Sequence, residues 1–201
     1  MQRKLWVIAI LLVALIFSVR TEAIMVMSFT VEELTARAEK VFVGTCTNVS
    51  HRVNDHGVPV TEVTFAVSEA VKGEVGTTVT FQQLDTQAQQ RPPRAASEDL
   101  LQENPHGFAA NAAIANLPNY LPGEEVLLFL AAPGKLGLTA PIGFMQGKLP
   151  VTTLTSGEKV ITNTAFKKTT AANSVFPNPG KTAQYEQFLK ALRDLTQAEH
   201  Q

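Results

Sequence analysis

Cysteine is almost absent from this 201-residue chain, which contains Cys46 alone. One cysteine excludes a disulfide within the chain, so the fold must be stabilised by its apolar core. Aromatic residues other than phenylalanine are also rare, with one Trp and two Tyr. Basic residues show no excess, because 17 Lys and Arg stand against 18 Asp and Glu. Without clustered positive charge or stacking platforms, we expect no nucleic-acid partner.

The N-terminal segment has the layout of an export signal. Arg3 and Lys4 precede an almost unbroken apolar run over residues 5–19. As a helix this run is about 22 Å long, which is shorter than the roughly 30 Å hydrocarbon core of a membrane. Thr21 and Ala23 are small residues that suit the positions before a cleavage site.

These features predict a signal peptide over residues 1–23 and a single β-rich domain over residues 24–201. An uncleaved anchor, extended by the apolar residues 24–26, is the alternative and the one membrane contact that we expect. In either case the protein is exported, to the periplasm, the cell surface or the medium.

Helix signals stand at both ends of the predicted domain. Thr30 and Glu33 form a Thr-x-x-Glu capping box, and Val31, Leu34 and Ala38 share one helical face. They predict a short N-terminal helix. An amphipathic C-terminal helix, beginning after residues 178–180, is predicted by apolar residues three and four positions apart, namely Tyr185, Phe188, Leu189, Leu192 and Leu195.

Strand signals fill most of the chain between these helices. β-Branched runs and alternation predict strands at 41–49, 58–71, 77–84, 126–131, 136–145, 147–155 and 160–164. In the second run, Val63, Phe65, Val67 and Val71 should share the buried face. Residues 126–131 are apolar on both faces, which is typical of a central strand. Turns are predicted at 54–57, 122–125 and 156–158.

The alternation fails over a long polar insertion at residues 86–121. Connections of this length are uncommon in compact domains, and many of them are functional loops. Within the insertion only residues 97–102 predict a brief helix, with Ser97 as its N-cap. The whole pattern predicts a mainly β fold of five to seven strands. It is either a small OB-like, Greek-key barrel or a curved sheet, and the C-terminal helix covers an edge or an open end.

Cys46 is the first candidate for catalysis. The segment 44–52 resembles a sortase, in which a cysteine follows a threonine and an arginine lies a few residues further on. The resemblance implies a cysteine transpeptidase or hydrolase that uses Cys46 with Arg52 and His51 as helpers. In sortases the histidine precedes the cysteine, whereas His51 follows it here. We therefore favour Cys46 as a half-buried strand residue.

His51, Asp55 and His56 lie close together in sequence and offer two nitrogens and a carboxylate to zinc. A structural zinc site uses four protein ligands and a catalytic site three plus water. Because nothing in the sequence fixes a complete set, we favour a solvated turn over a metal site. We expect no cofactor.

Four segments resemble a set of exported bacterial proteins without assigned function. They are residues 38–46, 63–73, 122–130 and 146–151. The order of elements is also similar to netrin-module and metalloproteinase-inhibitor barrels, which are OB-like. Those inhibitors act through an N-terminal cysteine held by disulfides, and this chain has neither. The resemblance therefore implies a fold but no inhibitory activity.

The function predicted from these observations is that of an exported, non-catalytic binding module. Its ligand, a protein, peptide or glycan, is expected to contact the insertion at 86–121, because long loops on a rigid frame are often recruited for recognition. The cysteine enzyme and a small zinc-binding protein are the alternatives.

Overall fold

A computed structural model describes residues 28–87, 116–163, 176–178 and 180–198. Its elements are, in chain order, α2 (Val31–Arg37), β1 (Lys40–Val53), β2 (Pro59–Lys72), β3 (Thr78–Leu84), β4 (Glu125–Leu130), the 3-10 helix η3 (Phe144–Gly147), β5 (Lys148–Thr153), β6 (Lys159–Thr162), β7 (Thr182–Gln184) and α4 (Tyr185–Ala198). The predicted signal peptide, the brief helix at 97–102 and most of the insertion lie outside the described residues.

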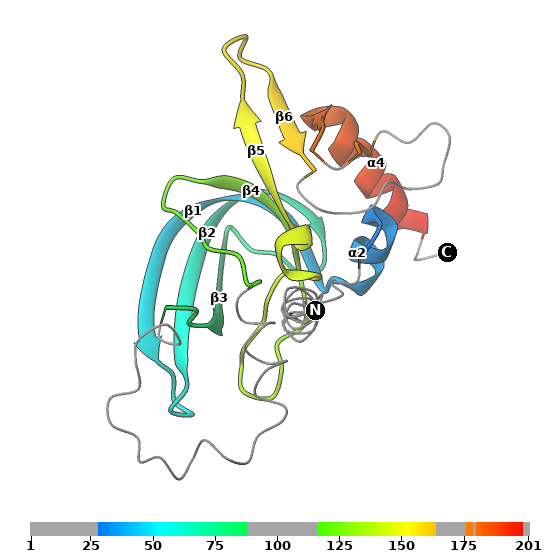
Figure 1. The fold of residues 1–201 in the computed structure, drawn as a ribbon. Coiled ribbons are helices and arrows are strands. Elements are labelled where there is room, and N and C mark those ends of the chain that lie inside the picture. The colour runs from blue at the N-terminus through cyan, green and yellow to red at the C-terminus, as the bar shows by residue number, and fades with distance from the viewer. Residues whose placement is uncertain (1–27, 88–115, 164–175, 179, 199–201) are drawn as a thin grey trace, which may run out of the picture.

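All seven strands belong to one antiparallel sheet in the order β3-β2-β1-β4-β5-β6-β7. The first four have the Greek-key order, in which the fourth strand returns to lie beside the first. The sheet is curved and does not close on itself, so of the two predicted architectures the curved sheet is the one observed. Figure 1 shows β1 to β4 curling round one side of the molecule. The helices α2 and α4 lie on the other side, and the β5–β6 hairpin projects from the body.

The two predicted helices are present with the expected buried faces. The backbone N–H of Glu33 donates to Thr30 Oγ1 (3.2 Å), and the Thr30 N–H donates to Glu33 Oε2 (2.8 Å), which confirms the capping box. α4 buries Tyr185, Phe188 and Leu189 against the sheet and α2. No helix among the described residues is long and apolar enough to cross a membrane.

Two apolar clusters form on opposite faces of the central strands. The inner core, inside the curl, consists of Phe42, Cys46, Val63, Phe65, Val79, Phe81, Tyr120, Val126, Leu128 and Leu130. The helix-side core, under the helices, consists of Val31, Leu34, Ala38, Val41, Val43, Leu127, Phe129, Leu149, Val151, Ile161, Phe176, Tyr185, Phe188, Leu189 and Leu192. β1 and β4 contribute to both clusters, and β4 is buried on both faces from Val126 to Leu130. The prediction of a central strand here is confirmed.

β-Bulges divide β2 between these two cores. The register of β1 with β2 shifts three times, and Ser68 and Val71 have no Cα partner on β1. Each extra residue reverses the alternation of side chains that follow it. Val67 therefore packs on the inner core, whereas Val71 packs on the helix-side core. The prediction that Val71 shares a face with Val63 and Phe65 is wrong for this reason.

Two further differences from the predicted elements lie in the second half of the chain. Residues 136–145 were expected to form a strand, but they form a turn, two isolated bridges and the start of η3. Gly137 and Gly143 have positive φ angles (71° and 63°), which a regular strand does not contain. The short edge strand β7 precedes α4, so the helix begins at Tyr185 instead of directly after residue 180.

Candidate functional site

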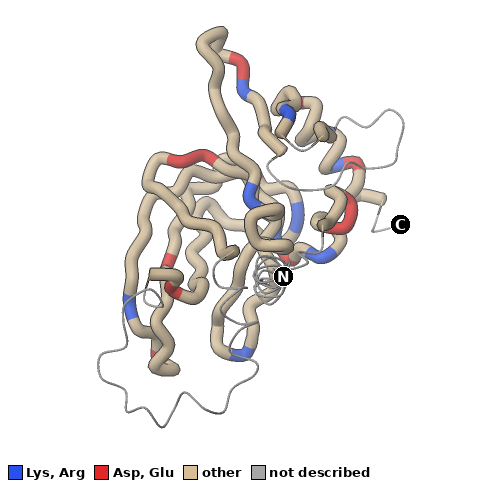
Figure 2. Tube along the Cα trace, viewed as in Figure 1, with Lys and Arg blue, Asp and Glu red and all other residues tan. Residues whose placement is uncertain are grey.

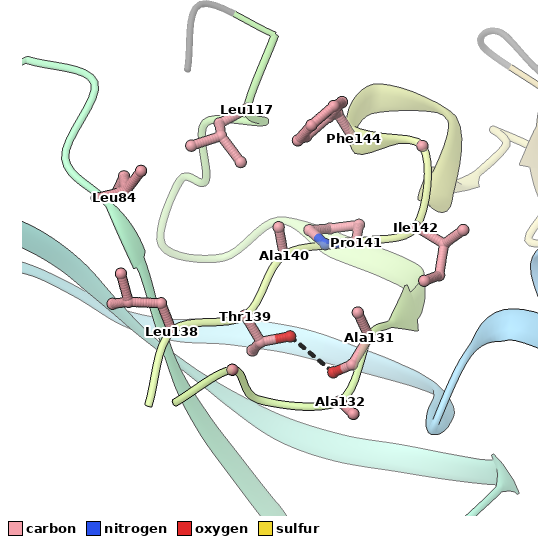
Figure 3. Close-up of a pocket in the computed structure, with 12 residues that line it drawn as sticks. Leu84, Leu117, Ala131, Ala132, Leu138, Thr139, Ala140, Pro141, Ile142 and Phe144 are labelled. Carbon is pink, nitrogen blue, oxygen red and sulfur yellow. Dashed lines mark hydrogen bonds between the residues drawn. The ribbon is translucent and has the colours of Figure 1, made fainter. Parts of the chain in front are cut away.

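An apolar pocket of about 470 Å³ lies between the end of β3 and the chain segment that follows β4 (Figure 3). Its volume is in the range of small-molecule sites. The pocket is lined mainly by a segment that follows β4, together with one residue from β3 and one that precedes β4. The lining residues are Leu84, Leu117, Ala131, Ala132, Gly134, Leu138, Thr139, Ala140, Pro141, Ile142, Gly143 and Phe144.

The segment 131–144 is held in place by backbone hydrogen bonds at both of its sides. The N–H of Ile142 donates to the carbonyl of Phe129 (2.7 Å), which ties the segment to β4. The N–H of Thr139 donates to the carbonyl of Gln82 (2.8 Å), which ties it to the outer edge of β3. Thr139 Oγ1 donates to the carbonyl of Ala131 (2.6 Å), so its hydroxyl already has a partner (Figure 3). The pocket therefore has a preformed, largely hydrocarbon wall.

The two chain segments that flank the predicted insertion meet at this pocket. Leu84 ends β3, and Leu117 lies shortly before β4. Gln83 Nε2 donates to the carbonyl of Pro118 (2.8 Å), and Tyr120 lies in the inner core, only 5% exposed. Leu117 and Tyr120, which the sequence assigned to the polar insertion at 86–121, are therefore part of the packed fold.

Lys148 fixes the same stretch from β5. Its ammonium group is largely buried and donates to the carbonyl of Asn119 (2.6 Å). It also pairs with Glu124 (2.6 Å) and lies 4.8 Å from the centre of the Tyr120 ring. Burial, followed by the charge of Glu124, raises the pKa of Tyr120 well above its usual value. Sequence reasoning missed this cluster, because Lys148 lies far along the chain from its partners Asn119, Tyr120 and Glu124.

A second, polar pocket of about 270 Å³ lies at the outer edge of β3. It is enclosed by the β1–β2 turn, β3 and the tip of the segment 131–144, with Arg52, Asn54, Asp55, His56, Thr80, Phe81, Gln82, Leu136 and Gly137 as lining. Arg52 donates to Glu62 Oε2 (2.6 Å), and so does Gln82 (3.1 Å). The hydrogen bond from Arg52 is the main reason that the pKa of Glu62 is lowered.

Cys46 lies in the inner core and is 1% exposed. Burial, and next the negative charge of Glu124, raises the pKa of its thiol. Among the described residues, no hydrogen bond or ion pair joins Cys46 to His51 or Arg52, and the guanidinium of Arg52 is paired with Glu62. The thiol is therefore inaccessible, and Arg52, the cation expected to assist it, is paired elsewhere, whereas a reactive cysteine needs an exposed thiolate in an electropositive setting.

His51 has a partner that the sequence did not indicate. Its Nδ1 lies 3.2 Å from Asp85 Oδ2 at the end of β3 and 3.3 Å from the hydroxyl of Thr61. In a catalytic triad the acid and the nucleophile contact different ring nitrogens. Here both contact the same nitrogen, so the trio orients the ring but does not form a proton relay.

Asp55 and His56 lie in the β1–β2 turn, apart from this pair. Asn54 Oδ1 accepts from the backbone N–H groups of His56 and Val58 (both 3.0 Å), which explains why the turn forms. No three His, Cys, Asp or Glu residues of the described chain are grouped to hold a metal ion. The structure does not bring His51, Asp55 and His56 together as one ligand set.

No family model, curated protein or solved structure matches this chain. The resemblances to exported bacterial proteins, to netrin-module barrels and to sortases therefore stay predictions. A functional conclusion must be drawn from the geometry of the two pockets, because function depends on the site and not on the fold.

Proposed function

We propose that the protein is an exported, non-catalytic binding module, and that the apolar pocket between β3 and the segment 131–144 receives a hydrocarbon part of its ligand. The observation that carries the proposal is the pocket itself, a preformed hydrocarbon hollow of about 470 Å³. A concave apolar site with few polar groups is typical of ligand binding.

The lining of the pocket favours binding over catalysis. None of its twelve lining residues is an acid, a base or a nucleophilic cysteine. The one hydroxyl, that of Thr139, already donates to the carbonyl of Ala131. The walls that a bound group would contact are hydrocarbon, so affinity would come from the apolar area removed from water. Leu84 and Leu117, which line the pocket, lie close in sequence to the two ends of the segment 88–115.

Binding of the fluorescent probe N-phenyl-1-naphthylamine to the purified protein tests this proposal. We expect saturable binding, and we expect Leu138→Asp to weaken it about tenfold or more, because a carboxylate would be placed in the hydrocarbon wall. Leu154→Asp is the matched control. Leu154 is 43% exposed near the β5–β6 turn and does not line the pocket.

The proposal is abandoned if the probe does not bind, or if both variants bind it equally well. Circular dichroism of Leu138→Asp establishes that the variant is folded. Export is tested separately by sequencing the N-terminus of the protein recovered from an envelope fraction. The expected result is a chain that begins at Ile24.

A further inference from the structure

The apolar and polar pockets are neighbours along one seam. Gln82 lines the polar pocket and Leu84 the apolar one, and their side chains lie on the same face of β3. Residues two apart on a strand are about 7 Å apart. On the segment 131–144, which pairs with β3, Leu136 lines the polar pocket and Leu138 lines the apolar one. The hydrogen bond between Thr139 and Gln82 separates them.

The polar pocket offers hydrogen-bond donors and acceptors without an excess of one charge. The positive charge of Arg52 is neutralised by Glu62. The lining of the pocket contains one carboxylate, that of Asp55, and no lysine. Acids and bases are also interspersed over the described chain (Figure 2). An anionic ligand is normally held by free cations, which the lining lacks. A single exposed carboxylate in water binds a cation weakly.

Sugar hydroxyls fit this set of groups. Each hydroxyl both donates and accepts, and the pocket offers the guanidinium of Arg52 and the ring of His56 as donors. The carboxylate of Asp55 and the amide oxygen of Gln82 are acceptors. Among the described residues, the side chains of Asp55 and His56 form no hydrogen bond or ion pair, so they are available. Leu136, 47% exposed, provides an apolar wall for the C–H face of a sugar ring.

An extended peptide could also span two neighbouring pockets, but the boundary between them does not suit it. The amide groups of such a peptide need partners where the chain crosses from one pocket to the other. At the crossing, the N–H of Thr139 and the carbonyl of Gln82 are already bonded to each other. A glycosidic oxygen followed by methylene groups carries no donor that must be satisfied there.

We infer that the ligand is an amphiphilic glycoside, whose hydrocarbon chain fills the apolar pocket and whose sugar residue lies in the polar pocket among Arg52, Asp55, His56 and Gln82. This inference rests on the proposed function, because it assigns the apolar pocket to the same ligand. It adds the chemical class of the headgroup.

Calorimetric titration with three octyl glycosides tests the inference, namely the β-glucoside, the β-galactoside and the N-acetyl-β-glucosaminide, each below its critical micelle concentration. 1-Octanol supplies the chain alone. At least one glycoside should bind about tenfold more tightly than 1-octanol. The double variant Asp55→Ala/His56→Ala should reduce that affinity to the level of 1-octanol and leave 1-octanol binding unchanged. Asp194→Ala, which removes an exposed carboxylate on α4, is the matched control.

The outcomes separate the two proposals. If 1-octanol and the naphthylamine probe bind but no glycoside binds more tightly, the binding module stands and the glycoside is wrong. If the peptide acetyl-Leu-Ala-Gln-amide binds more tightly than every glycoside, the ligand class is wrong in favour of a peptide. If the double variant binds the glycosides as the parent protein does, the polar pocket is not the sugar site. If neither the probe nor 1-octanol binds, both proposals fail.

Discussion

The inner core and the helix-side core stabilise the same sheet in different ways. The inner core is built round four aromatic rings, with Phe65 in contact with Phe42, Phe81 and Tyr120 at centroid distances of 5.9, 6.2 and 5.5 Å. It also contains a thiol and a phenol. The helix-side core has a smaller aromatic share, four of fifteen residues, with one ring pair, Phe176 and Phe188 at 5.0 Å, and it packs the amphipathic stripes of α2 and α4 against the strands. The polar pocket includes Phe81 of the inner core, whereas Ile142 of the apolar pocket packs on the helix-side core.

This difference indicates a division of roles within one sheet. On the helix side, local sequence patterns and packing agree, which is typical of regions that serve stability. Around the inner core, polar atoms are buried and loops are fixed by long-range hydrogen bonds, which is typical of binding sites. The central strands β1 and β4 form a wall shared by both cores, so we expect the two to unfold together.

Removing one ring from each core is the strongest test of that expectation. Phe65→Ala and Phe188→Ala should each lower the free energy of unfolding by about 3–5 kcal/mol, because both rings are fully buried. Urea unfolding followed by fluorescence and by circular dichroism should give one coincident transition in both variants. If Phe188→Ala unfolds in two steps, the helix-side core is an independent unit and the shared wall does not couple it to the inner core.

The two tyrosines should respond with opposite signs. The Tyr120 hydroxyl is buried and has no hydrogen-bond partner among the described residues, so Tyr120→Phe should raise the free energy of unfolding by about 1 kcal/mol. The Tyr185 hydroxyl has the Ser68 hydroxyl as a polar neighbour, so Tyr185→Phe should lower the free energy of unfolding by up to about 1 kcal/mol. Chemical denaturation at pH 7 measures both. If both substitutions change the free energy of unfolding in the same direction, the distinction between the two cores is contradicted.

The thiol of the inner core should make stability fall in alkali. Burial raises the pKa of Cys46, so the folded protein keeps this proton at a pH where the unfolded chain, with a thiol pKa of about 8.5, loses it. The contribution is therefore complete below about pH 8 and decreases as the pH rises, by less than about 1 kcal/mol at pH 9.

Cys46→Ala should flatten this alkaline slope in urea midpoints measured from pH 7 to 10. Iodoacetamide should label the parent protein only after denaturation. Rapid labelling of the folded protein at pH 8 would show that the thiol is accessible and would reopen the cysteine-enzyme alternative.

The smallest effect is expected on the solvent-facing side of β1 and β2. The pKa of Glu62 is lowered by Arg52, so the ion pair stabilises the fold above the unfolded carboxyl pKa of about 4.3 and is lost as the pH falls through the lower folded value. Because both side chains are partly exposed, Glu62→Gln should cost only about 0.5 kcal/mol at pH 7 and nothing at pH 2. Glu158→Gln, in the exposed β5–β6 turn, should have no effect in the same titration.

Much of this fold was predictable because its signals are local. The capping box at Thr30, the turn at Asn54, the alternation of Val63 with Phe65 and the apolar stripe of α4 each depend on residues within a few positions. Such patterns fix the type of an element and the face that it buries. The mainly β fold followed from the number and spacing of the strands, which left a barrel and a curved sheet as alternatives.

The features missed depend on contacts distant in sequence. Val71 packs on the helix-side core and not on the inner core, because bulges interrupt β2. A bulge has no clear signature in a single sequence. Tyr120 stands in a polar stretch but is buried by Phe65 and Phe81. Leu138 lines a pocket because its segment pairs with β3, over fifty residues earlier. Neither pocket was predictable, since each is assembled from segments that only the folded chain brings together.

The β5–β6 hairpin, which projects from the body in Figure 1, has a practical use. Its tip is exposed from Thr153 to Glu158, and neither pocket includes any of these residues. An antibody epitope or a fluorophore inserted between Thr155 and Ser156 would therefore contact neither the two pockets nor the core. With such a label, the protein can be located in living cells and isolated with both pockets unchanged.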